Sequence, residues 1–181
     1  MVTKHGRDLK VSKLDAAKRQ LETAIRLYFS NGDPVSIHTL SAAAYEILFD
    51  ISKRRGAEPM FIKDKFIDLL RPESQRKFAQ KVNEAENFFK HADRDPEATL
   101  DFNPGSSEYL MWDACWQYSK LTGEEPPLFT THRVWFMANN PDFFNPPEEF
   151  EEVLHGNAHS IVQMGRARYF AMALPAFMSI T

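Results

Sequence analysis

The chain has 181 residues and a mass of about 20.9 kDa, a length that is typical of one domain. Hydrophobic residues make up 43% of it, and its 15 phenylalanines exclude an intrinsically disordered chain. It has no long apolar run, and its basic N-terminal region lacks an apolar segment, so we expect neither a membrane span nor a secretory signal. The single cysteine, Cys115, excludes an intramolecular disulfide and favours a cytoplasmic protein.

Charge is distributed unevenly along the chain. Residues 1–56 carry +4 and residues 101–181 carry −6, within a net charge of −3. A basic first third favours contact with a polyanion, although +4 is modest beside dedicated DNA-binding domains. The alternative is that these two regions are solvated helix faces of different sign.

Helix boundaries are marked by a repeated Asp-Pro or Asn-Pro pair. The Asp or Asn side chain accepts hydrogen bonds from the first helical turn, and proline already has the helical φ, so each pair predicts a helix start or the turn before one. The pairs are Asp33-Pro34, Asp95-Pro96, Asn103-Pro104, Asn140-Pro141 and Asn145-Pro146. Gly56 and Gly123 are placed to end helices, because glycine adopts the left-handed conformation at low cost.

Hydrophobic periodicity predicts a helical chain. Apolar residues recur every three or four positions, as at Leu14, Ala17, Leu21 and Ile25, and Ser12 with Asp15 resembles a capping box. The predicted helices cover residues 12–30, 34–55, 59–70, 72–91, 104–122, 130–139 and 147–174. Strand signals are scarce, since no alternating run of β-branched residues is bounded by hairpin turns.

These patterns predict one all-α domain over residues 1–181, a helical bundle of four or five main helices with short peripheral helices. We expect residues 1–11 to be flexible, and residues 146–181 to form a C-terminal extension that packs on the bundle or on a partner. The large apolar side chains of this extension would need a partner if they were exposed, which favours a homodimer. The extension has no basic cluster, which argues against binding to a membrane surface.

The richest candidate site lies at the end of the helix predicted over residues 72–91. Asn87 and His91 are four residues apart, so they share a helix face that the apolar stripe leaves free. A histidine beside cations can act as a general acid or base, or can bind phosphate, so Asn87 and His91 are the candidate catalytic residues. Three charged neighbours are candidate binding residues: Lys90, Asp93 and Arg94. The alternative is that His91 and Lys90 only stabilise the negative end of the helix dipole.

His38 is a further candidate binding residue, one turn into the helix predicted over residues 34–55. The alternative is a buried packing histidine whose ring is hydrogen-bonded within the core. If the helices over 34–55 and 72–91 are antiparallel, His38 lies toward His91, and the two histidines could share one site.

Glu151, His155 and His159 recur at intervals of four, a spacing that suits a transition metal if the helix is continuous. Gly156 lies between them and weakens the helix prediction, which favours a solvated face instead. We therefore assign no metal site and no cofactor.

Two segments, residues 33–48 (DPVSIHTLSAAAYEIL) and 87–96 (NFFKHADRDP), resemble a bacterial family of uncharacterised helical proteins. More distantly, the chain resembles the HEPN superfamily of helical bundles from toxin and defence systems. Many HEPN members are metal-independent, dimeric ribonucleases with an arginine, a polar residue and a histidine near a helix end. Here His91 matches the histidine and Asn87 the polar residue, whereas Glu86 stands at the arginine position of the shortest spacing.

Three function classes follow, and whether the protein is an enzyme stays open. The first is a HEPN-like, RNA-associated protein, either a degenerate ribonuclease or a nucleic-acid-binding member of a defence or toxin–antitoxin system. The second is a non-enzymatic homodimeric interaction module. The third is a metal- or small-ligand-binding bundle that uses His38, His91, Asp93 or the face that carries His159. A carboxylate in place of the arginine would repel a phosphate, which weighs against ribonuclease catalysis.

Overall fold

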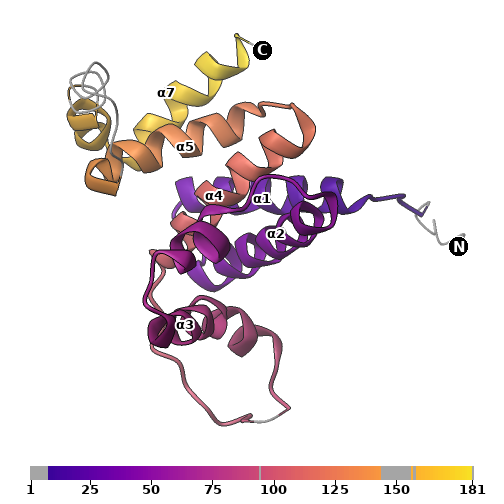
Figure 1. Cartoon of the computed structure of the whole chain (residues 1–181). Coiled ribbons are helices and arrows are strands. Elements are labelled where there is room, and N and C mark those ends of the chain that lie inside the picture. Colours follow the sequence, from indigo (N-terminus) through magenta and orange to yellow (C-terminus); the bar gives the residue numbers. More distant parts are fainter. Residues whose placement is uncertain (1–7, 94, 144–155, 157, 181) are drawn as a thin grey trace, which may run out of the picture.

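The computed structural model describes residues 8–93, 95–143, 156 and 158–180. These residues form helices joined by loops, with no strand among them, which confirms the predicted all-α class (Figure 1). The elements are α1 (Lys13–Phe29), α2 (Pro34–Arg55), η1 (Phe61–Phe66), α3 (Pro72–Lys90), α4 (Ser106–Thr122), α5 (Pro127–Asn139), η2 (Pro141–Phe143) and α7 (Arg166–Met178). None of the helices described is long and apolar enough to cross a membrane.

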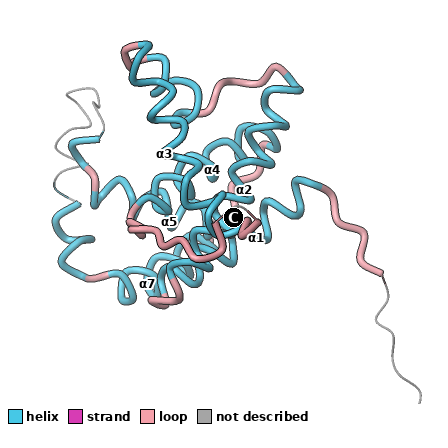
Figure 2. The backbone as a smooth tube through the Cα atoms, turned by 90° about the horizontal axis from the view of Figure 1, so that it is seen from below, coloured by secondary structure: helices cyan, strands magenta, loops and turns pink. Residues whose placement is uncertain are grey.

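Three helices, α1, α2 and α4, form the centre of the bundle. α1 packs along α2, α2 packs against α4, and α5 covers α1 and α4. α7 lies on α5 at one end of the molecule, and α3 lies at the opposite end (Figure 1). α3 packs against α2 and stands at the edge of the bundle, where a long loop leads on to α4 (Figures 1 and 2).

The local signals in the sequence explain where α1 and α2 begin and end. Ser12 and Asp15 form the predicted capping box at the start of α1. The Asp33 carboxylate caps α2 by accepting a hydrogen bond from the amide of Ser36 at 2.7 Å. Gly56 ends α2 with a φ of +59°, a conformation that residues with a Cβ rarely adopt. The helices predicted over 12–30 and 34–55 are therefore confirmed.

Two of the predicted helix signals are wrong in detail. The segment over 59–70 is a six-residue π-helix, η1, followed by a short turn, rather than an α-helix. Asp95-Pro96 lies at a turn that no helix follows, and the chain has no regular secondary structure from there to the next Asn-Pro pair. That next pair is the turn before α4, in which the Asn103 side chain accepts a hydrogen bond from the amide of Gly105 at 3.0 Å.

The continuous helix predicted over 147–174 is also wrong. Gly165, with a φ of +77°, separates a helical segment at 158–164 from α7, which continues to Met178. Tyr169 of α7 is buried against the bundle, whereas Met172 is 56% exposed. The homodimer inferred from this extension stays a prediction. Residues 1–7, 144–155, 157 and 181 lie outside the described residues, and with them part of the segment that we expected to be flexible.

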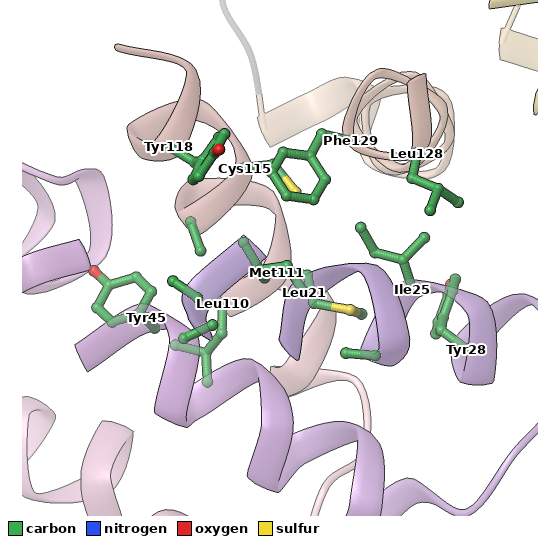
Figure 3. Close-up of a cluster of buried hydrophobic side chains, with 14 of the residues drawn as sticks. Leu21, Ile25, Tyr28, Tyr45, Leu110, Met111, Cys115, Tyr118, Leu128 and Phe129 are labelled. Atoms are coloured by element: carbon green, nitrogen blue, oxygen red, sulfur yellow. The ribbon is translucent and has the colours of Figure 1, made fainter. Parts of the chain in front are cut away.

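The core fills the space between α1, α2, α4 and α5 (Figure 3). Its buried side chains include Leu21, Ile25, Tyr45, Leu110, Met111, Cys115, Tyr118, Leu128 and Phe129. Cys115 is fully buried, and burial raises the pKa of its thiol, which keeps this cysteine protonated and unreactive.

One buried carboxylate connects this core to η1. Asp113 of α4 accepts hydrogen bonds from the amides of Phe61 and Ile62, at 3.0 and 2.9 Å, and from the hydroxyl of Tyr45 at 2.9 Å. The Tyr45 hydroxyl in turn accepts a hydrogen bond from the amide of Lys63 at 3.2 Å. Asp113 thus caps the first turn of η1 from a different helix, which holds η1 against the bundle.

We predict that Asp113→Ala destabilises the fold by about 3–5 kcal/mol, because it leaves three buried donors without an acceptor. Urea unfolding measures the change. Ser119→Ala is the matched control on the same helix, since the buried Ser119 hydroxyl has no hydrogen-bond partner among the described residues. We expect that control to change the free energy of unfolding by less than about 0.5 kcal/mol. Equal effects of the two substitutions would contradict the role of Asp113.

Candidate functional site

An apolar pocket of about 320 Å³ lies between α2, η1, α3 and α4. Its lining residues are His38, Phe61, Ile62, Phe66, Phe78, Lys81, Val82, Ala85, Ser106, Tyr109, Leu110 and Phe143. Most of these side chains are apolar, and His38, Ser106 and Lys81 bring the clearly polar groups. A mostly apolar pocket with a few polar groups is the usual form of a small-molecule site.

Two aromatic contacts set the shape of the pocket wall. Phe61 and Phe66 come from η1, which Asp113 holds in place. The Phe66 ring meets Phe78 of α3 with their centroids 5.1 Å apart, and the Phe61 ring meets Phe143 of η2 at 5.4 Å. The apolar stripe of α3 therefore turns toward η1 and α4, and its side chains are only partly buried because the pocket lies beneath them.

His38 is the buried polar group of this pocket. Its side chain is 1% exposed, and its Nδ1 lies 3.0 Å from the Ser107 hydroxyl. The rings of Phe89 and Phe102 contact it edge-on, with centroids 5.8 and 5.0 Å away. Its Nε2 is buried without a hydrogen-bond partner among the described residues. Burial lowers the pKa of His38, although the carboxylate of Glu86 acts in the opposite direction, so the ring is neutral at pH 7.

A second, polar groove of about 860 Å³ lies between α3 and the loop that follows it. Asn87 and His91 are both exposed and both line it, as their spacing predicts. Asp93 lines it as well, and Arg94 lies outside the described residues. The groove carries charges of both signs, because Glu84, Asp93 and Asp95 accompany Lys77 and Lys81 among its lining residues.

Lys90 and Glu86 belong to the side of α3 that faces away from this groove. Lys90 forms an ion pair with Glu86, one helical turn earlier, and neither residue lines the groove. Glu86 is 8% exposed, and its carboxylate is close enough to affect the pKa of both His38 and Lys63. The residue at the HEPN arginine position therefore lies apart from Asn87 and His91.

The two candidate histidines, His38 and His91, lie at the same end of the bundle but in different surroundings. His38 contacts Phe89, two residues before His91, as expected if it lies near the end of α3. His38 lines the apolar pocket and His91 lines the polar groove, so the structure does not bring them into one site. Lys81 lines both the apolar pocket and the polar groove.

No group of three metal-ligating side chains occurs within the described part of the chain. Glu151 and His155 lie outside that part, and His159 is exposed with its Nε2 2.8 Å from the Gln163 amide nitrogen. Sequence reasoning missed Lys81 and the aromatic wall of the pocket. The signal for that wall was the density of phenylalanine in the middle of the chain, and no sequence motif singled out Lys81.

Comparison with known proteins found no matching family model, no similar curated protein and no similar solved structure. The resemblance to HEPN proteins therefore stays a prediction.

His132 is a second buried histidine, and its surroundings predict a pH-dependent stability. It packs against Tyr28, Phe29 and Phe136, and neither of its ring nitrogens has a hydrogen-bond partner in the described structure. Burial lowers the pKa of His132 to about 3. The unfolded chain therefore binds this proton below about pH 6.5 while the folded chain does not, so the folded state loses stability as the pH falls from 6.5 toward 3.

We predict that, as the pH falls over this range, the free energy of unfolding of wild type decreases by up to about 1.4 kcal/mol more per pH unit than that of His132→Leu. Urea unfolding at pH 7.0, 6.0, 5.0 and 4.5 measures the difference between the two proteins. The carboxylates titrate in both proteins, so they cancel in the comparison. Parallel pH profiles would show that the folded state can protonate His132.

Proposed function

We propose that the protein binds a small, largely apolar molecule in the pocket between α2, η1, α3 and α4. The observation that carries this proposal is the apolar lining of the pocket, which includes His38, a buried residue whose Nε2 has no hydrogen-bond partner among the described residues. Leaving a buried polar atom unpaired costs about 1–3 kcal/mol. A ligand that hydrogen-bonds to Nε2 would remove that cost.

The pocket volume limits the size of the ligand. A water molecule occupies about 30 Å³ in the liquid, so a pocket of about 320 Å³ holds about ten non-hydrogen atoms. The aromatic and aliphatic walls favour an apolar body over a sugar or a nucleotide. Each buried methylene group contributes about 0.8 kcal/mol to the free energy of binding, so burial of the apolar body can drive the binding of a ligand of this size.

The chemistry of His38 selects the polar group of the ligand. The Ser107 hydroxyl at Nδ1 can donate or accept, so Nε2 is either an N–H donor or a lone-pair acceptor. A ligand hydroxyl pairs with both forms because it also can donate or accept. An alcohol or a phenol is therefore a suitable first probe.

We predict that 4-ethylphenol and octan-1-ol bind saturably and raise the melting temperature, because each fills the pocket with about ten non-hydrogen atoms. Ala85→Phe places a ring in the pocket and should abolish binding while the helical circular dichroism is unchanged. NMR shift changes confined to pocket residues locate the ligand. Absence of binding by both probes, or equal binding by Ala85→Phe, would contradict the proposal.

His38 is tested by the difference between 4-ethylphenol and ethylbenzene, which lacks the hydroxyl. One hydrogen bond is worth about 1 kcal/mol, so we expect wild type to bind the phenol about five-fold more tightly, beyond any difference seen in His38→Leu. Using this ratio removes general effects of the substitution on the fold. An unchanged ratio in His38→Leu would exclude a hydrogen bond from Nε2 to the ligand.

RNA binding at the polar groove is a second candidate function, and the observation that favours it is the exposure of Asn87 and His91 on one wall. Lys77 and Lys81 add positive charge beside them, whereas Glu84, Asp93 and Asp95 oppose it. These carboxylates favour weak binding of RNA without cleavage, which corresponds to a degenerate HEPN-like protein rather than an active ribonuclease.

We predict that a labelled mixed-sequence RNA pool in EDTA is not cleaved, and that any binding weakens steeply between 50 and 200 mM salt as phosphate contacts are lost. His91→Ala should weaken that binding at least about three-fold, and fluorescence anisotropy measures it. His159→Ala is the matched control, because His159 is exposed but lies away from the groove. Binding that is absent or insensitive to salt would end this candidate, and cleavage lost in His91→Ala would establish a ribonuclease.

A further inference from the structure

We propose that the natural ligand of the pocket is an amphipathic monocarboxylate of about ten non-hydrogen atoms, whose carboxylate pairs with the ammonium group of Lys81. This inference rests on the proposed function of the pocket. It adds the class of the ligand, a medium-chain or arylalkyl carboxylic acid, and the residue that recognises its charge.

Lys81 is the one formally charged side chain among the described residues that line the pocket. Its side chain is 72% exposed, and it also lines the polar groove. Lys81 therefore lies where an apolar interior meets solvent. A ligand with an apolar tail in the pocket and an anionic head at this boundary matches both environments, because the tail leaves water while the head stays solvated.

The present partner of Lys81 is easily replaced. Lys81 pairs with Glu84, three residues later on α3, and the Glu84 side chain is 45% exposed. Exposed ion pairs of this kind contribute little to stability, so turning Lys81 toward a ligand carboxylate costs little. Glu84 lines the groove and does not line the pocket, so the described pocket lining contains no carboxylate that would repel an anionic ligand.

His38 does not supply a competing charge. Burial lowers the pKa of His38, so its ring is neutral at pH 7 and contributes a hydrogen bond only. Lys63 and Lys65 belong to η1, and their ammonium groups pair with Glu46 and Glu58. Neither lysine lines the pocket. Among the described residues that line the pocket, Lys81 is therefore the one that can favour an acid over the matching alcohol by its charge.

The test compares octanoate with octan-1-ol, which differ in charge and share the same alkyl chain. Isothermal titration calorimetry at pH 7 and low salt measures both affinities for wild type, Lys81→Gln and Lys77→Gln. Lys77 is the matched control because it lies one turn before Lys81 and lines the groove without lining the pocket. Circular dichroism confirms that each variant is folded.

We expect Lys81→Gln to weaken octanoate binding about five-fold and to leave octan-1-ol binding unchanged. Lys77→Gln should change neither affinity beyond the error of the titration. If both ligands bind and Lys81→Gln affects neither, or if Lys77→Gln lowers octanoate affinity equally, the carboxylate inference is wrong and the apolar pocket remains. If neither ligand binds wild type, the proposed function itself fails.

Discussion

The arrangement of the pocket depends on the hydrogen bonds that α4 makes to η1 and to the segment before it. Asp113 binds the first amides of η1, and one turn later the Gln117 side chain donates to the carbonyl of Glu58 at 3.1 Å. These contacts fix a short, irregular helix that has no strong packing face of its own. With η1 held in this way, Phe61 and Phe66 form part of the pocket wall, and α3, which packs against α2, also places Phe78 against the Phe66 ring.

This arrangement explains why parts of the fold can be predicted from sequence and others cannot. The ends of α1 and α2 follow from contacts within one helical turn, such as Ser12 with Asp15 and Asp33 with Ser36. The anchoring of η1 depends on Asp113, about fifty residues away in the chain. The hydrophobic periodicity within 59–70 carries no information about a contact with a distant residue. The sequence therefore predicts a helix there but neither its type nor the residue that holds it in place.

The candidate site divides in the same way. Asn87 and His91 line one groove because both lie on one helix, and helical spacing alone predicts that. The separation of His38 from His91 depends on how far α3 tilts from α2, which the sequence does not encode locally. His38 could be proposed as a binding residue from its type, but its unpaired Nε2 and its contact with Ser107 appear only once α2 and α4 are packed.

α3 is the element that lines both the apolar pocket and the polar groove. Its apolar stripe faces the pocket, its polar strip faces the groove, and Lys81 lies on the boundary between them. An amphipathic helix is stabilised mainly by burying its apolar face, yet Phe78, Val82 and Phe89 of α3 are only partly buried. A molecule that fills the pocket would complete that burial, whereas RNA in the groove would contact only the polar strip, whose carboxylates oppose it. Incomplete burial of α3 is therefore the physical reason to favour a small apolar ligand over a nucleic acid at this end of the bundle.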